Sequence, residues 1–282
     1  MDRRAIVLEP IAPSETVAAV AASWLALYVP TARSPRNVAM TAQRIRDYLN
    51  PFMGEDPIQG VRPDDVRAYR VWLERRDLAP RTVRHLLADA RCLMNWAVDS
   101  SILEHSPFPR RIMPRIQETL PDRLTADEIR AVLAIREPQA FVIRLGLTTG
   151  LRWGELCRAR AGNLRMGMLE ISQTKSGRVR RVPIPAAMVV EICARVGRLV
   201  PYGEGSAGSF NKLVRRHSGV GRFHVHQLRH SFACNWIERG GSLPSLQQVL
   251  GHASVTTTQH YAKLSDEHVR REAERIATAG ML

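Results

Sequence analysis

The sequence predicts a mostly α-helical protein with one small β-hairpin, an α+β fold in two domains. Apolar residues recur at helical spacing through most of the 282 residues, and only the segments 168–173 and 179–184 have strand-like patterns. A stretch with four prolines among arginines, 106–122, interrupts the helical pattern and predicts the domain boundary. Each part is long enough to bury its own core.

Four helices are expected before this boundary, over 16–29, 34–49, 63–76 and 80–98. Ser34 and Pro35 supply a cap followed by proline at the first helical position. The fourth helix has the clearest apolar face, and its opposite face carries Arg81, Arg84, His85 and Arg91. Such a basic face is typical either of a solvated surface or of contact with a DNA backbone, and both interpretations stay open.

Beyond the boundary the pattern predicts helices with a single hairpin between them. Thr125 and Glu128 form a capping box for a helix that reaches 135, and helices over 138–148 and 152–158 follow, the first ending at Gly150. The two strands flank Lys175-Ser-Gly-Arg178. Further helices are expected near 186–199 and 209–217, in three short pieces between 226 and 261, and in 265–281. The expected division is a tail (1–15), a helical domain (16–107), a linker (108–122), a second domain (123–264) and a C-terminal segment (265–282).

The charge of the chain indicates an anionic partner. The net charge is +14 and the pI is near 10.8, which favours nucleic acid. An acidic membrane surface would also fit, but the sequence has neither an 18-residue apolar run nor a polybasic cluster beside an anchor. Acidic residues precede the apolar segment 16–29, where a signal peptide carries basic ones, so we expect a cytoplasmic protein that works at the host nucleoid.

The cysteines predict neither disulfides nor a metal site. Cys92, Cys157, Cys193 and Cys234 are far apart, and we interpret them as thiols in a reducing compartment. His224, His226 and Cys234 lack a second ligand pair at zinc spacing, so no metal is expected.

Several basic residues stand in positions that an ordinary surface does not explain. His226, Arg229 and His230 share one helical face beside an apolar stripe. Nearly all the positive charge is arginine, so Lys175 at the hairpin turn is unusual. Taken alone, each residue could be a satisfied core histidine, a surface arginine or a turn lysine.

Their order along the chain is more specific. Thr149 to Leu156 (TGLRWGEL), Lys175, His226-x-x-Arg229, Leu250-Gly-His252 and Tyr261 together resemble the tyrosine recombinase (phage integrase) family over about 124–264. The resemblance implies a mainly helical tyrosine recombinase catalytic domain after a SAM-like, four-helix core-site DNA-binding domain. It is similar to the compact Xer-like or small phage integrase type. The residues before Thr16 are too few for a separate arm-site-binding domain, so none is expected.

The resemblance also implies a role for each residue. Tyr261 is the expected nucleophile that forms a 3′-phosphotyrosine. Arg152 and Arg229 are expected to clamp the phosphate, because a guanidinium is planar and permanently charged. His226 would accept the proton of a phenol whose ordinary pKa is about 10. Lys175 fits the general acid, since a lysine can release a proton and an arginine cannot. His252 would hydrogen-bond a non-bridging oxygen. Supporting roles fall to Glu155 and His230, and DNA contacts are expected from Arg81, Arg84, Arg91, Arg110, Arg111 and Arg178.

The sequence thus predicts a site-specific DNA recombinase that needs no metal or nucleotide cofactor. Its expected partners are double-stranded core sites, three further copies of itself in a tetramer on DNA, and an accessory directionality factor. Two alternatives stay open: a type IB topoisomerase, which shares this chemistry without choosing a site, and a DNA-binding protein that keeps the fold without the reaction.

Overall fold

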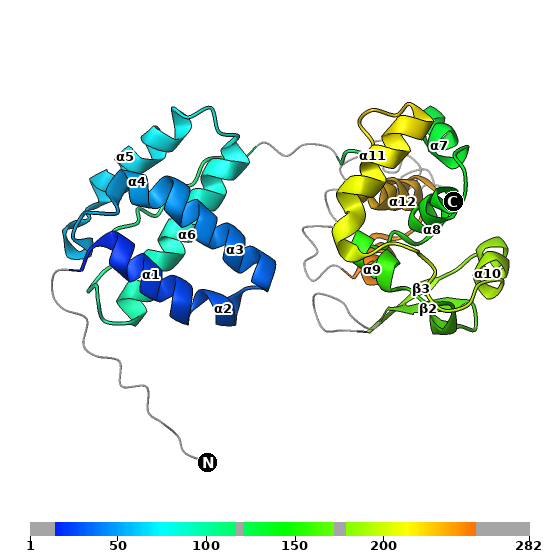
Figure 1. The fold of residues 1–282 in the computed structure, drawn as a ribbon, viewed down its shortest axis with the longest axis horizontal. Helices are drawn as coiled ribbons and strands as arrows, with labels where there is room; N and C mark the ends of the chain where they lie inside the picture. Colours follow the sequence, from blue (N-terminus) through cyan, green and yellow to red (C-terminus); the bar gives the residue numbers. More distant parts are fainter. Residues whose placement is uncertain (1–14, 117–120, 172–178, 252–282) are drawn as a thin grey trace, which may run out of the picture. The chain divides into compact units, whose positions relative to one another are not determined.

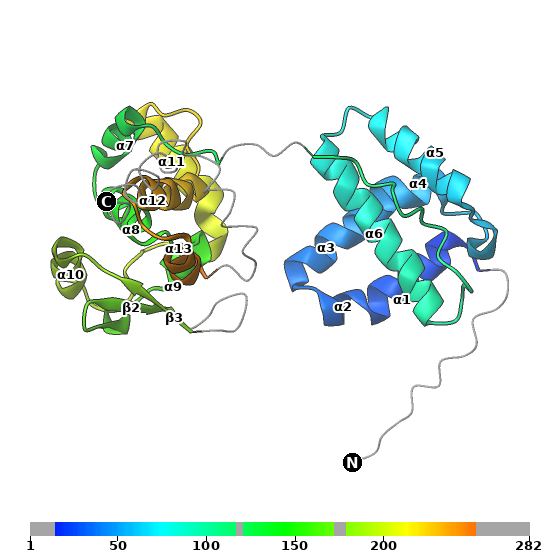
Figure 2. The same ribbon diagram turned by 180° about the vertical axis from the view of Figure 1, so that it is seen from behind.

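The computed structural model describes residues 15–116, 121–171 and 179–251, and the chain divides into two compact units, Met1–Glu118 and Thr119–Leu282. Figure 1 and Figure 2 show that both units are built mainly of helices and that the small sheet belongs to the second. Each unit buries an apolar core of its own. The predicted fold class, mostly helical with a small sheet, is confirmed.

In the described part of the first unit, the regular elements are all helices, and α6 packs against α1, α5 and η1. Its elements are α1 (Val17–Leu27), α2 (Val29–Ala32), α3 (Pro35–Arg44), the π-helix η1 (Ile45–Leu49), α4 (Asn50–Met53), the 3₁₀ turn η2 (Ile58–Gly60), α5 (Pro63–Glu74) and α6 (Pro80–Asp99).

The second predicted helix runs four residues further than expected. The amide of Asn50 donates to the carbonyl of Ile45, five residues back, so the chain passes from α3 through η1 into α4. Proline at position 51 has no N–H, and in an α-helix its ring would clash with the carbonyl four residues earlier. The wider π turn makes room for the ring, and the helix continues to Met53.

The segment that follows α6 is held by the first unit. Ile112 is buried, and its carbonyl accepts a hydrogen bond from Arg70 Nη1 at 3.0 Å. Arg91 Nη2 donates to the carbonyl of Pro109 at 3.1 Å, and the guanidinium of Arg91 lies over the ring of Phe108. Residues 108–112, the early part of the proline-rich stretch, therefore pack on these helices and are called the strap below.

The second unit is mainly helical and contains one three-stranded antiparallel sheet of order β1-β2-β3. Its elements are α7 (Ala126–Leu133), α8 (Gln139–Thr149), α9 (Trp153–Arg158), η3 (Ala161–Asn163), β1 (Leu164–Arg165), β2 (Met168–Ile171), β3 (Arg180–Pro183), α10 (Ala186–Cys193), η4 (Glu204–Ser206), α11 (Ala207–Ser218), α12 (His226–Glu238) and α13 (Leu243–Leu250). Helix α12 packs on α8 and α13, and α13 in turn packs on β3.

The expected hairpin is present as β2 and β3. Leu169 pairs with Val182 and Ile171 with Arg180, while residues 172–178, including Lys175 and Arg178, lie outside the described residues. The extra strand β1 pairs with β2 across Met166 and Gly167, whose φ angles are 49° and 73°. A two-residue turn of this kind needs two left-handed residues, and a methionine in the first position gives no sequence signal for it.

The helix expected over 186–199 is shorter in the structure, where α10 covers Ala186–Cys193. Residues 197–199 instead run beside 159–161, joined by an isolated antiparallel bridge between Arg160 and Arg198. None of the described helices is long and apolar enough to cross a membrane.

Candidate functional site

The Thr149-Gly-Leu-Arg152 segment is the turn between two helices. Helix α8 ends at Gly150, which has a φ of 62°, and Arg152 is the N-cap residue of α9. A Cβ at Gly150 would lie 2.4 Å from Cδ1 of Phe232, so this position needs glycine both for its backbone angle and for its close contact with α12. The turn thereby sets Arg152 at the start of a helix.

Glu155, which the sequence places in a supporting role, is buried and fully hydrogen-bonded. Its Oε1 accepts from Arg180 Nη1 at 2.8 Å and from Arg152 Nη1 at 3.1 Å. Its Oε2 accepts from Arg180 Nη2 and from the backbone N–H of Arg152, both at 2.8 Å. Burial alone would raise the pKa of Glu155, but the hydrogen bonds and charge of Arg180, with the Arg152 contacts, lower it to about 2. Glu155 is therefore an anion that fixes two arginines.

Arg180 is the residue that sequence reasoning missed. Its side chain is 6% exposed, and its Nε donates to the carbonyl of Val249 at 2.8 Å. It therefore connects β3, the first turn of α9 and the last turn of α13, which leads to Gly251. The available signal was its position on the strand, since Arg180 and Val182 point to the same, buried face of the sheet.

Arg229 is 2% exposed, and it bridges the ends of two helices. Its Nη1 donates to the carbonyl of Gly150 and its Nη2 to the carbonyl of Leu250, both at 2.8 Å. These carbonyls belong to the C-terminal ends of α8 and α13, where the helix dipole favours a positive charge. The guanidinium of Arg229 is thus held in one orientation from two sides.

Both histidines of α12 have a lowered pKa, so the neutral imidazole predominates at neutral pH. Their rings meet edge to face with centroids 5.1 Å apart. Although His226 is exposed at the start of α12, partial desolvation, followed by the positive charges of Arg229, His224 and Arg152, lowers its pKa. Burial and the neighbouring His226 and His224 lower the pKa of His230 to about 4. A neutral His226 can accept a proton.

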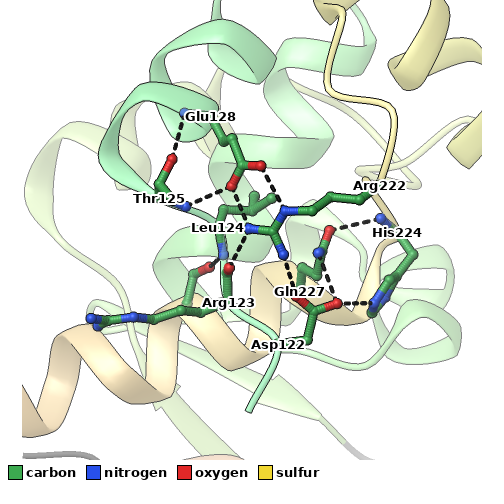
Figure 3. A network of polar contacts seen from close by, with 9 residues as sticks. Asp122, Arg123, Leu124, Thr125, Glu128, Arg222, His224 and Gln227 are labelled. Carbon is green, nitrogen blue, oxygen red and sulfur yellow. Dashed lines mark hydrogen bonds and ion pairs between the residues drawn. The ribbon is translucent and has the colours of Figure 1, made fainter. Parts of the chain in front are cut away.

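A polar network holds the start of the second unit against the start of α12 (Figure 3). Asp122 Oδ2 accepts from His224 Nε2 at 3.1 Å and from Gln227 Nε2 at 3.0 Å, and Arg222 pairs with Asp122 Oδ1. Arg222 Nε also donates to Glu128 Oε1 at 2.7 Å, and Glu128 closes the predicted capping box with Thr125. The network fixes the turn that precedes His226.

The structure brings part of the predicted set together. Arg152 and Glu155 are in contact, Arg229 is bonded to the carbonyl beside them, and His226 lies within the field of both arginines. In the first unit, Arg81, Arg84, Arg110 and Arg111 are exposed, whereas Arg91 binds the strap. The remaining predicted residues lie outside the described residues: Lys175, Arg178, His252 and Tyr261.

Comparison with protein families and with curated proteins gives consistent matches. The model described as "Phage integrase family" matches residues 203–268. The chain is 32% identical to tyrosine recombinase XerA of Pyrococcus furiosus over 184 residues, 57% of this chain and 64% of that protein. It is 27% identical to tyrosine recombinase XerC of Xanthomonas campestris over 243 residues, 77% of this chain and 74% of that protein. The matches to the XerA proteins thus span somewhat less than two thirds of their length.

Solved structures share the fold at low sequence identity. A Tn1549 transposon integrase in complex with transposon right-end DNA superposes with a TM-score of 0.75 at 18% identity, covering 93% of this chain and 99% of that one. A lambda integrase dimer bound to a COC′ core site gives a TM-score of 0.72 at 16% identity, covering 89% and 97%. A lambda integrase tetramer bound to a Holliday junction gives 0.68 at 15% identity, covering 86% and 79%.

Proposed function

Because the chain belongs to the tyrosine recombinase (phage integrase) family, we propose that it cuts and rejoins DNA at specific sites through a covalent 3′-phosphotyrosine. One observation carries the proposal to this chain: the guanidiniums of Arg152 and Arg229 are both fixed at the α8–α9 turn, one by Glu155 and the other by the carbonyl of Gly150. Two oriented, permanent cations suit the charge that a phosphodiester develops when it is attacked.

In the proposed reaction, Oη of Tyr261 attacks phosphorus, and the bond to the 5′ oxygen breaks. The phenolic proton passes to His226, whose lowered pKa keeps it neutral and ready to accept. Lys175 gives a proton to the leaving 5′ oxygen, and His252 donates a hydrogen bond to a non-bridging oxygen. Rejoining runs these steps in reverse with a 5′-hydroxyl as nucleophile, so neither metal nor nucleotide is needed.

The buried ion pair adds a positioning role for Arg180. Glu155 cannot hold Arg152 in place unless its own charge is balanced, and Arg180 balances it with a two-pronged contact. Since Arg180 also binds the end of α13, it joins the segments that lead to Lys175 and to His252. His230 contacts His226 edge to face and limits the positions of its ring.

Partners are proposed on the same basis. Relatives of this fold bind core-site DNA as a dimer and a Holliday junction as a tetramer, and we propose a tetramer of this chain on two duplexes. The helical domain 16–107 would contact core-site DNA through Arg81 and Arg84, joined by the 108–122 linker with Arg110 and Arg111 to the catalytic domain 123–264. The segment 265–282 would dock on a neighbouring copy, an accessory factor would set direction, and the reaction would take place in the cytoplasm, at the nucleoid.

Covalent capture tests this function. The wild type and Tyr261→Phe are each incubated with genomic DNA, denatured, and the protein-linked ends are sequenced. We expect adducts from the wild type alone, clustered at one inverted repeat. The variant should bind DNA within about 1 kcal/mol of the wild type, because one hydroxyl contributes little net binding energy.

The other outcomes separate the alternatives. Adducts scattered along the DNA would favour a topoisomerase, and adducts formed by Tyr261→Phe would show that another residue is the nucleophile. Tight binding with no adduct from either protein would indicate a DNA-binding protein without this reaction.

A further inference from the structure

The second unit contains a basic pocket beside the proposed phosphate clamp, which is formed by Arg152 and Arg229. Neither of these two arginines lines the pocket. The pocket has a volume of about 340 Å³, and its charged lining residues are Glu155, Arg158, Arg160, Glu170 and Arg198. Glu155 belongs to the wall of this pocket and also binds Arg152, so the pocket and the clamp share a border.

Two of its arginines, Arg160 and Arg198, stand directly opposite each other on adjacent extended segments. Arg160 and Arg198 form an isolated antiparallel bridge, flanked by hydrogen bonds from Ala161 N to Gly197 O and from Leu199 N to Ala159 O, both at 2.9 Å. Hydrogen bonds on the flanking residues mark a non-hydrogen-bonded pair, in which the Cα atoms are about 4.5 Å apart and the side chains are closest. Like charges directly opposite each other destabilise such a pair.

The acids of the pocket already have other partners. Glu155 is saturated by Arg180 and Arg152, and Glu170 pairs with Arg181 at 3.1 Å. The third arginine, Arg158, pairs with Glu204. Within 15–116, 121–171 and 179–251, no carboxylate forms an ion pair with Arg160 or Arg198. The pocket therefore presents two opposed positive charges that this part of the protein does not balance.

We propose that Arg160 and Arg198 together bind one phosphate of the DNA backbone, next to but not at the bond that is cut. The inference rests on the proposed function. Two guanidiniums can each present parallel N–H donors to phosphate oxygens, and the bound phosphate removes the repulsion between them. A duplex held at Arg152 presents further phosphates along the same strand, which makes the DNA backbone the anion nearest to the pocket.

The salt dependence of DNA binding tests this proposal. Affinity for an unselected duplex is measured over a range of salt concentrations for the wild type, Arg160→Gln, Arg198→Gln and the double variant R160Q/R198Q. Each phosphate contact contributes about 0.9 to the slope of log K against log salt. We expect the double variant to lose about one contact, and each single variant to lose nearly as much, since both arginines bind the same phosphate.

Arg136→Gln is the matched control, because it removes an exposed arginine that lines neither the pocket nor the clamp. It should keep the wild-type slope. Thermal unfolding without DNA is the second control. The melting temperature of R160Q/R198Q should equal or exceed that of the wild type, because the change relieves repulsion between like charges.

The proposal is overturned if the wild type binds and cleaves DNA while R160Q/R198Q keeps the wild-type slope, or if R136Q loses as much slope as the double variant. It is also overturned if the double variant melts at a lower temperature, which would assign the pair to the fold. If inorganic phosphate raises the melting temperature of the wild type alone while the DNA slopes stay equal, the pocket binds a free phosphate compound instead. A wild type that binds no duplex would overturn both this proposal and the proposed function.

Discussion

Among the described residues, each unit of the protein buries a carboxylate between two arginines, and the two clusters differ in how completely they are hydrogen-bonded. In the first unit, Asp89 of α6 contacts Arg33 Nη1 at 2.7 Å and Arg44 Nε at 2.9 Å. In the second, Glu155 contacts Arg180 and Arg152 through four hydrogen bonds. The clusters use the same three charges, one negative and two positive.

The difference lies in geometry. Asp89 Oδ2 and Arg44 Nε are close, yet neither forms a hydrogen bond of good geometry, so the Asp89 cluster holds by charge and by the single bond to Arg33. In the Glu155 cluster both carboxylate oxygens accept two donors. Charge attraction alone tolerates shifts in position, whereas a two-pronged arginine contact fixes both distance and angle. The loosely bonded cluster joins helices, and the tightly bonded one lies where the proposed reaction needs fixed arginines.

Of the variants that test this contrast, Arg180→Met should have the largest effect on stability. The change leaves Glu155 buried without its main partner, which typically costs about 3–5 kcal/mol of unfolding free energy. Calorimetry of the full chain should show this loss in the transition of the second unit only. Arg181→Met is the control from the same strand: its side chain is 67% exposed, so its pairing with Glu170 should contribute less than about 1 kcal/mol. Equal losses from the two variants would contradict the role given to Arg180.

The second test is Asp89→Asn in the first unit. The amide keeps the shape of the side chain and can still accept from Arg33, so we expect a loss of about 1–3 kcal/mol, in the transition of the first unit. The rate of adduct formation at saturating protein should stay at the wild-type level. Denaturation monitored by calorimetry and a cleavage time course measure the two effects. A larger loss than that of Arg180→Met would reverse the ranking of the clusters.

Both clusters also show how far the sequence leads. Helical spacing predicts most helices, and the order of the motifs predicts the family. The same spacing puts Asp89 on the apolar face of α6, between Leu86 and Leu93, and strand alternation puts Arg180 beside Val182. Burial of both charges was thus open to prediction. Their partners were not: Arg33 is 56 residues from Asp89 and Arg180 is 25 from Glu155, and only the packed chain selects such pairs. The π turn at η1 escapes prediction because proline is ordinarily a signal for the end of a helix.

The stability of the second unit should also depend on pH, through His230, with a smaller effect than that of the two substitutions above. His230 has a pKa of about 4 in the folded chain, below its value of about 6.5 in an unfolded chain. Between these two pH values the unfolded chain binds a proton that the folded chain does not. The contribution of neutral His230 to the free energy of unfolding is therefore fully present above pH ~6.5 and decreases as the pH falls toward ~4. The ring is only partly buried, so we expect a loss of about 1–2 kcal/mol.

Replacing His230 with glutamine should remove that part of the loss. Urea denaturation of the full chain at about pH 7 and about pH 4.5 measures it as the difference between wild type and variant. The transition of the first unit, which contains Asp89 but not His230, provides the internal control. If the difference stays constant over this pH range, His230 titrates normally in the folded protein.

The smallest expected effect separates the buried Glu155 cluster from the exposed network around Asp122. Asp122 accepts two hydrogen bonds and pairs with Arg222, nearly as many contacts as Glu155 makes, but its side chain is 51% exposed whereas that of Glu155 is 3% exposed. Water competes for exposed charges, so Asp122→Asn should cost less than about 1 kcal/mol of unfolding free energy.

At about 1 M salt, where charges are screened within ~3 Å, this cost should disappear, while the cost of Arg180→Met persists. Asp127→Asn, which removes an exposed acid that pairs with Arg130, should cost even less. If the Asp122→Asn loss survives high salt, the network stabilises the turn before His226 through its hydrogen bonds, and burial would not be what distinguishes the two sets of charges.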